Sequence, residues 1–132
     1  MLHARGLALV GATLALTAVP TLACAQACMS DRSDREIAEG KLAIASRQDA
    51  AGRPERPYIL TLAAPACLTA TDPQDSVEST RTIHIFSSRD DVHAQIAQFV
   101  GKTVLVRGQP FAAHTSHHHA PIVMDIAEID SH

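Results

Sequence analysis

The feature that most constrains this chain is a pair of apolar runs, residues 102–113 and 120–130, separated by six polar residues. Two extended runs joined by a short polar connection are typical of a β-hairpin. Four of the six connecting residues are histidines, so the predicted hairpin, residues 102–130, carries a concentration of imidazole at its tip. This tip is the most concentrated chemistry in the sequence.

Three further strands are predicted ahead of the hairpin. They cover residues 36–45, 58–62 and 80–87, where apolar residues alternate or β-favouring residues are bounded by proline. The second of them is expected to place Cys67 at a strand terminus. The stretches between them, residues 46–57 and 71–79, carry proline and charge and are predicted to be loops.

One helix is predicted between the third and fourth strands. Ser88 suits the N-cap, and the acidic residues after it suit the first turn. A single apolar stripe follows and Gly101 ends the helix; the stripe consists of Val92, Ile96, Phe99 and Val100.

The predicted order of elements is strand, strand, strand, helix, strand, strand. This is the order of the five-stranded barrel of the OB-fold, which has its helix between strands 3 and 4. We therefore expect a mainly β domain over residues 36–132, an OB-fold-like small barrel. The alternative is an open sheet with one helix packed on a face.

The first 25 residues have the pattern of a secretory signal peptide. One basic residue, Arg5, precedes an apolar run of about 14 residues, shorter than the roughly 20 that a membrane helix needs. Cleavage is expected before Gln26, with a cut before Cys28 as an alternative. A lipoprotein-like reading, in which Cys24 is lipidated, is the rival. The mature chain is expected to be periplasmic or secreted, without a transmembrane segment, and to begin with a polar lead-in over residues 26–35.

Removal of the signal peptide leaves two of the three cysteines, Cys28 and Cys67. In an oxidising compartment such a pair is expected to form a disulfide. Closing a loop of about 40 residues stabilises a domain by roughly 3–4 kcal/mol. The alternative is two buried free thiols.

Charge excludes one class of partner. Loss of Arg5 leaves 10 of the 11 basic residues against 14 acidic ones, a formal charge of about −4. The basic residues are scattered and aromatic residues are few, so we expect neither a nucleic-acid surface nor an anionic-membrane surface.

The histidines at the tip are candidate metal ligands. With a two-residue turn at residues 115–116, His114, His117 and His119 share one face, with His118 as an alternate. Three histidines with an open position are a familiar zinc arrangement, and imidazole also suits copper.

A second hairpin register is open. A three-residue loop, residues 115–117, would pair His114 with His118 and turn His119 to the other face, and a bulge at Gly108 is compatible with either register. The histidines are also open to a plainer interpretation, as solvated loop residues that titrate near neutral pH. His84 is expected to be a packed or rim residue rather than a ligand.

The tip resembles a known family. The segments that carry the resemblance are Gly-Lys-Thr-Val at residues 101–104, His-Thr-Ser-His-His-His at 114–119 and Pro-Ile-Val at 121–123. They are similar to the uncharacterised secreted bacterial family known as domain of unknown function 4431, over residues 83–129. This chain has Ser116 and Ala120 where the family pattern has glycine and threonine, and a serine at that turn favours a wider loop. The resemblance implies a fold and a site but no activity.

The sequence thus predicts a small exported domain that binds Zn2+ or Cu2+, or another small ligand, through its histidine cluster. The first alternative is a non-catalytic envelope module that binds another protein. The second is a metal-dependent hydrolase, for which Asp125 is the closest candidate base along the chain. We expect a binding module rather than an enzyme.

Overall fold

The computed structural model describes residues 6, 8–19 and 27–132 of the 132-residue chain. It is mainly β, as predicted, with one α-helix among the described residues. The strands are β1 Met29–Ser30, β2 Glu36–Ile44, β3 Arg47–Gln48, β4 Pro54–Glu55, β5 Tyr58–Thr69, β6 Val77–Phe86, β7 Thr103–Ala112 and β8 Ile122–Ser131. The helices are α1 Asp90–Ile96 and two 3-10 turns, Pro73–Asp75 and Ala97–Phe99.

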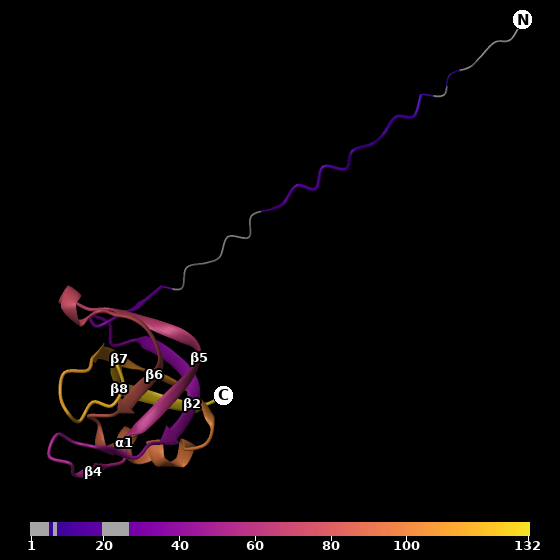
Figure 1. The fold of residues 1–132 in the computed structure, drawn as a ribbon. Coiled ribbons are helices and arrows are strands. Elements are labelled where there is room, and N and C mark those ends of the chain that lie inside the picture. Colours follow the sequence, from indigo (N-terminus) through magenta and orange to yellow (C-terminus); the bar gives the residue numbers. More distant parts are fainter. Residues whose placement is uncertain (1–5, 7, 20–26) are drawn as a thin grey trace, which may run out of the picture.

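Six of the strands form one sheet in the order β1-β5-β2-β7-β8-β6, and β5 also pairs with β6. The pairings of β2, β5, β6, β8 and β7 therefore return to their starting strand (Figure 1). Within this circuit β6 and β8 are parallel, and the other pairs are antiparallel. The short strands β3 and β4 pair only with each other.

The strands enclose an apolar core because every second residue points inward. Its largest fully buried side chains are those of Leu42, Leu60, Leu68, Ile83, Ile85, Ile96, Ile122, Met124, Ile126, Val104, Val106 and Val123. The predicted helix stripe is confirmed, since Val92 and Ile96 are buried and Phe99 and Val100 pack against the core. The helix covers one end of the strands (Figure 1).

A bulge bends β7 at Gly108, a position at which the sequence allowed one. The register of β7 against β8 shifts between Arg107 and Gly108. A Cβ atom on Gly108 would overlap the backbone of Asp125 and Ile126, so only glycine fits where β8 approaches this closely.

Three local predictions were wrong. Strand β5 continues to Thr69 through two register shifts, so Cys67 lies within the strand rather than at its terminus. Residues 46–57 are not simply a loop, because they contain the β3–β4 hairpin. The N-cap of α1 is Arg89 and not Ser88: the Ser87 hydroxyl accepts the Arg89 backbone N–H at 3.2 Å, which delays the helix start by one residue.

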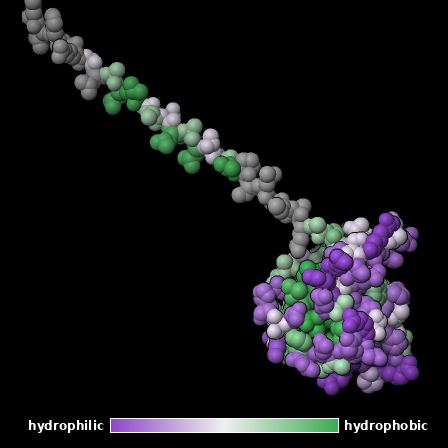
Figure 2. Space-filling view, turned by 180° about the vertical axis from the view of Figure 1, so that it is seen from behind, coloured by the Kyte–Doolittle hydropathy of each residue, from purple (hydrophilic) through white to green (hydrophobic). Residues whose placement is uncertain are grey.

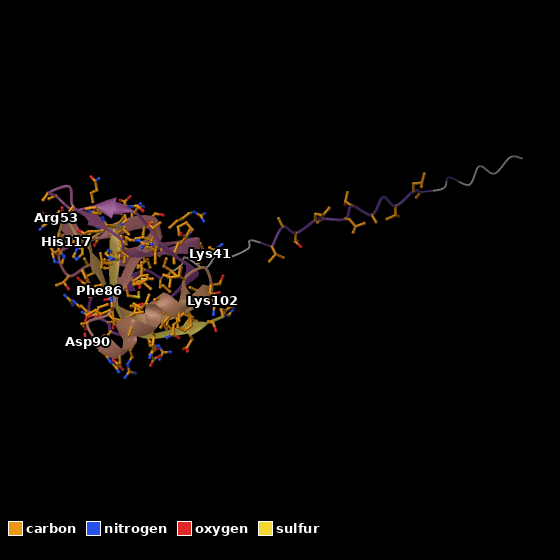
Figure 3. All side chains as sticks on the ribbon, turned by 90° about the horizontal axis from the view of Figure 1, so that it is seen from below. Lys41, Arg53, Phe86, Asp90, Lys102 and His117 are labelled. Atoms are coloured by element: carbon orange, nitrogen blue, oxygen red, sulfur yellow. A yellow bond between two sulfur atoms is a disulfide. The ribbon has the colours of Figure 1, made fainter. Side chains whose placement is uncertain are left out.

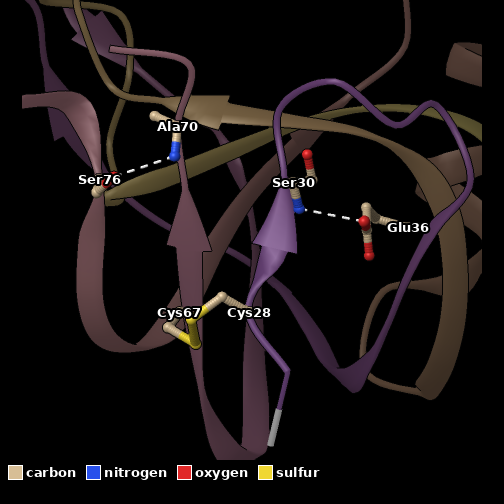
Figure 4. Close-up of a disulfide and its surroundings, with 6 residues drawn as sticks. All are labelled: Cys28, Ser30, Glu36, Cys67, Ala70 and Ser76. Atoms are coloured by element: carbon tan, nitrogen blue, oxygen red, sulfur yellow. Dashed lines mark hydrogen bonds between the residues drawn. A yellow bond between two sulfur atoms is a disulfide. The ribbon is translucent and has the colours of Figure 1, made fainter. Parts of the chain in front are cut away.

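The predicted disulfide between Cys28 and Cys67 is present and ties β1 to β5 (Figure 4). Hydrogen bonds fix the same region: the Ser30 N–H donates to Glu36, and the Ala70 N–H donates to Ser76. The chain that leads into β2 is therefore held at several points rather than at the cysteine alone.

The described residues before the domain, 6 and 8–19, form no helix or strand. Their large apolar side chains are exposed, Leu9 at 95% and Leu16 at 96%, and none belongs to the core. The predicted cleavage before Gln26 and the lipidation candidate Cys24 lie outside the described residues. Within the described ranges, no helix combines the length and the apolar character that crossing a membrane requires.

Candidate functional site

The histidines lie on the connection between β7 and β8. This loop is longer than the two- or three-residue loop of either register considered from the sequence. Strand pairing ends at Ala112 and Ile122, and one more bond joins the Ala113 N–H to the Pro121 carbonyl at 3.0 Å. The turn at the tip is closed by the His118 N–H, which donates to the Thr115 carbonyl at 3.1 Å. No described residue other than glycine has a positive φ. A tight primed turn would require a positive φ at its central residues, so Ser116 lies in a wider loop instead.

Two of the four histidines meet a carboxylate from a distant part of the chain. His117 Nδ1 donates to Glu55 Oε1 at 2.5 Å, and His119 Nε2 donates to Glu55 Oε2 at 3.1 Å. Glu55 belongs to β4, and Figure 3 shows His117 beside Arg53, just ahead of that strand. Hydrogen bonds from His119 and then from His117 hold the pKa of Glu55 below its usual value.

His84 supports His119 from the other side. The His119 backbone N–H donates to His84 Nδ1 at 3.2 Å, and the two ring centroids are 5.8 Å apart. His84 is half-buried; burial, followed by the positive charges that His119 and His118 can carry, lowers its pKa to about 4. His84 is therefore neutral near pH 7 and can accept this hydrogen bond.

The other two histidines form a separate group. His118 Nδ1 accepts backbone N–H groups from His114 at 3.0 Å and Thr115 at 3.3 Å. The ring centroids of His114 and His118 lie 4.6 Å apart. Both rings also pack against Phe111, with centroid distances of 5.6 Å for His114 and 5.3 Å for His118. Burial first, then the charges of the neighbouring histidines, lowers the pKa of His118. The structure thus divides the four predicted ligands into two pairs.

Hydrogen bonds fix which nitrogen of each ring carries a hydrogen. Glu55 accepts from His117 Nδ1 and His119 Nε2, so in the neutral rings His117 Nε2 and His119 Nδ1 keep free lone pairs. His118 uses its Nδ1 lone pair for the backbone, so its Nε2 carries the hydrogen. A metal bound beside Glu55 would use His117 Nδ1 and His119 Nε2 in place of their hydrogens, whereas His118 Nδ1 is already occupied by the backbone.

Comparison with known proteins identifies the segment that carries the loop. Residues 82–130 match the family model "Domain of unknown function (DUF4431)". The predicted resemblance is thereby confirmed. The match covers a little over a third of the chain, and no curated protein and no solved structure matches.

The matched segment, residues 82–130, contains all the histidines of the site but not Glu55. That glutamate comes from the β3–β4 hairpin, outside the match. The site is therefore assembled from the matched segment, residues 82–130, and from a hairpin that precedes it in the chain.

Asp49 is a second carboxylate near the histidine loop that connects β7 and β8. Ligand atoms of Asp49, Glu55 and His117 lie within 4.8 Å of one another. Asp49 already accepts the backbone N–H groups of Ala51 and Arg53, both at 2.9 Å, and Arg53 Nε at 2.7 Å. Its side chain is only 4% exposed, and the Arg53 backbone N–H is the main cause of its lowered pKa. Its present role is to hold the β3–β4 turn.

Sequence reasoning missed Glu55 as a site residue. It is 62 positions from His117, and its stretch was taken as a plain loop, so no local pattern connected the two. Asp125, the carboxylate considered along the chain, instead accepts the Ser88 N–H at 2.8 Å near the start of α1.

Proposed function

We propose that this chain is an exported domain that binds a divalent transition metal ion, Zn2+ or Cu2+, through Glu55, His117 and His119. The observation that carries the proposal is the Glu55 carboxylate, which contacts both imidazoles. A carboxylate between two histidines supplies the oxygen and nitrogen donors that these ions accept. His114 and His118 take a different role, holding the loop through their backbone bonds and their contact with Phe111.

The separations within the site tell which donors already lie close to one another. Tetrahedral zinc with bonds of about 2.0–2.2 Å needs ligand atoms about 3.3 Å apart. The two Glu55–histidine contacts are 2.5 and 3.1 Å, and Asp49 is within 4.8 Å of Glu55 and His117. The ion would take the place of the hydrogens that His117 Nδ1 and His119 Nε2 now share with Glu55. His119 is not in the group of ligand atoms that lie within 4.8 Å of one another, so its ring has to move toward His117 to complete the site. Asp49 would have to give up part of its bonding to Arg53, which makes it the weakest candidate ligand.

Export is supported by two features. The exposed apolar run within residues 6–19 has the composition of a signal peptide, and the Cys28–Cys67 bond belongs to an oxidising compartment such as the periplasm.

The OB-fold assignment is supported by the circuit of five strand pairings and by a helix between β6 and β7.

A second candidate, an envelope module that binds another protein, is favoured by a separate observation. A hollow of about 450 Å³ lies where β2 and β5 diverge beyond the Gly40–Leu62 pair, lined by Met29, Glu39, Gly40, Lys41, Leu62, Ala63, Ala64, Ala66 and Thr103. Figure 2 shows hydrophobic residues gathered in a hollow on the face seen from behind. Its apolar part would suit a hydrophobic side chain of a partner protein, with Glu39 and Lys41 available for polar contacts.

Calorimetry with Zn2+ and with Cu2+ tests the metal proposal. The protein is the untagged chain from Gln26 after chelator treatment. We expect a one-to-one complex with submicromolar affinity. The Glu55→Ala and His117→Ala variants should each weaken binding by at least the roughly 10- to 100-fold that loss of an outer partner of a metal ligand costs.

His114→Ala is the matched control. It removes the same type of side chain from the same loop, but one that does not contact Glu55. We expect its affinity to equal that of the unmodified chain. An equal loss in His114→Ala and His117→Ala would instead favour the ligand set predicted from the sequence. Weak binding with variable stoichiometry would refute a specific site.

A further inference from the structure

The β3–β4 hairpin is built as an independent unit, here called the flap and defined as residues 46–56. Its two strands pair only with each other and lie outside the six-stranded sheet. The flap joins the domain at a base that is closed by the Ala45 N–H and the Pro57 carbonyl at 3.0 Å. No backbone hydrogen bond within the described chain links residues 46–56 to the sheet.

The tip of the flap is rigid in itself. Asp49 accepts two backbone N–H groups and pairs with Arg53, and the Asp49 N–H donates to the Arg53 carbonyl at 3.0 Å. Gly52 has a φ of 76°, which glycine adopts without strain. The flap is therefore expected to move as one body about its base rather than to unfold.

A single side chain fastens the flap to the rest of the domain. Among the described residues, Glu55 makes the only side-chain hydrogen bonds that cross from the flap, and both go to the histidine loop. These bonds lie at a partly exposed position, since the Glu55 side chain is 24% exposed and that of His117 61% exposed. Water competes for hydrogen bonds at such a position, so this fastening is weak in the absence of a ligand.

We infer that the flap is a metal-latched gate over His119. This inference rests on the proposed function. His119 lies between His84 and Glu55, with its side chain 8% exposed, so an ion reaches it from the flap side only when Glu55 moves away. Once bound, the ion joins Glu55 to the loop histidines and so holds the flap shut.

The thermodynamic reason is differential affinity. Glu55 is a ligand only when the flap is closed, so an ion that uses it binds the closed form more tightly than the open form and shifts the population toward closure. The specificity of the gate follows from the same residue: an ion without affinity for carboxylate oxygen, such as Cu(I), leaves the flap free.

The test is 15N NMR relaxation, together with relaxation dispersion for slower opening, on the untagged chain from Gln26, without metal and with saturating Zn2+, which is diamagnetic. In the zinc-free protein we expect the order parameters of flap amides to be lower than those of β7. With zinc they should rise to the value of rigid backbone, about 0.85. The Glu55→Ala variant should keep a mobile flap in both conditions, and Arg56→Ala, which changes the neighbouring exposed residue, should behave like the unmodified chain.

Calorimetry on the same samples separates the two ideas. Zinc binding that leaves both the order parameters and the relaxation dispersion of the flap unchanged overturns the gate and leaves the metal site standing. Failure to bind zinc or copper overturns the metal site and the gate together. Zinc binding with a rise in flap order that Glu55→Ala abolishes supports both.

Discussion

Replacing the Cys28–Cys67 disulfide by a pair of serines should lower stability mainly through the unfolded state. The bond closes a loop with a sequence separation of 39 residues. In the chain-entropy treatment a loop of this length is worth about 4 kcal/mol at 25 °C. The domain has roughly 100 residues, for which an unfolding entropy of about 0.2 kcal/mol/K converts this loss to a fall in Tm of about 15–20 °C.

The native fold should survive the substitution, because other contacts hold β1 in place. Met29 and Ser30 pair with Leu68 and Thr69, and the Asp31 carboxylate accepts the backbone N–H and the hydroxyl of Thr71 at 2.7 and 2.9 Å. Strand β1 thus stays anchored without the sulfur atoms.

Urea denaturation of the chain from Gln26, with and without the double substitution, measures the effect. Beyond the loss of about 4 kcal/mol, the m-value should rise, because an unfolded chain without the cross-link exposes more surface. Reduction of the unmodified protein should reproduce both changes. A loss below about 1 kcal/mol, or a full loss with an unchanged m-value, would refute the argument from the unfolded state.

Three further predictions concern the stability of the metal-free protein, measured in the presence of a chelator. Burial depresses the pKa of His84 to about 4, so protonation favours the unfolded chain. The free energy of unfolding should therefore fall as the pH is lowered from about 6.5 to about 4. The full pKa shift corresponds to about 3.4 kcal/mol, which partial exposure of the ring reduces to about 1–2 kcal/mol. Urea titrations across that range should show a flatter profile for His84→Gln, and an unchanged slope would contradict the assignment. Gly108→Ala should cost about 1–3 kcal/mol, at the upper end because its Cβ meets the immobile backbone of Asp125 and Ile126; an unchanged Tm would show that the bulge adjusts freely. Ser87→Ala removes a 2.6 Å hydrogen bond to the Ile126 carbonyl and should cost about 1–3 kcal/mol; thermal unfolding measures it, and a neutral result would mean that the carbonyl finds another donor.

The elements that could be predicted are those in which a local pattern determines structure. The stripe of α1 is set by side-chain spacing along one helix, and the long strands were found because alternation shows on the side that faces the core. The disulfide followed from counting the cysteines that lie outside the predicted signal peptide. A bulge at Gly108 was considered only as a way to accommodate either hairpin register, and the structure has a register shift there.

The site could be predicted only in part, because it depends on contacts between distant segments. The histidines were visible as a cluster, but their division into two pairs results from a loop wider than either expected register. Glu55 was invisible because it acts across 62 residues. Strand β5 was expected to end early because Pro65 interrupts its pattern, whereas the register shifts in the sheet carry the strand past the proline.

Strand β8 determines when this domain can fold. It pairs with β6 and with β7, and its residues Ile122, Val123 and Met124 are fully buried. Because β8 follows both partners in the sequence, a chain that emerges N-terminal end first leaves two strand edges and much of the core unsatisfied until β8 appears. Contacts of such long range form slowly. The domain can therefore complete its sheet and core only once β8 is available, however early its other strands appear.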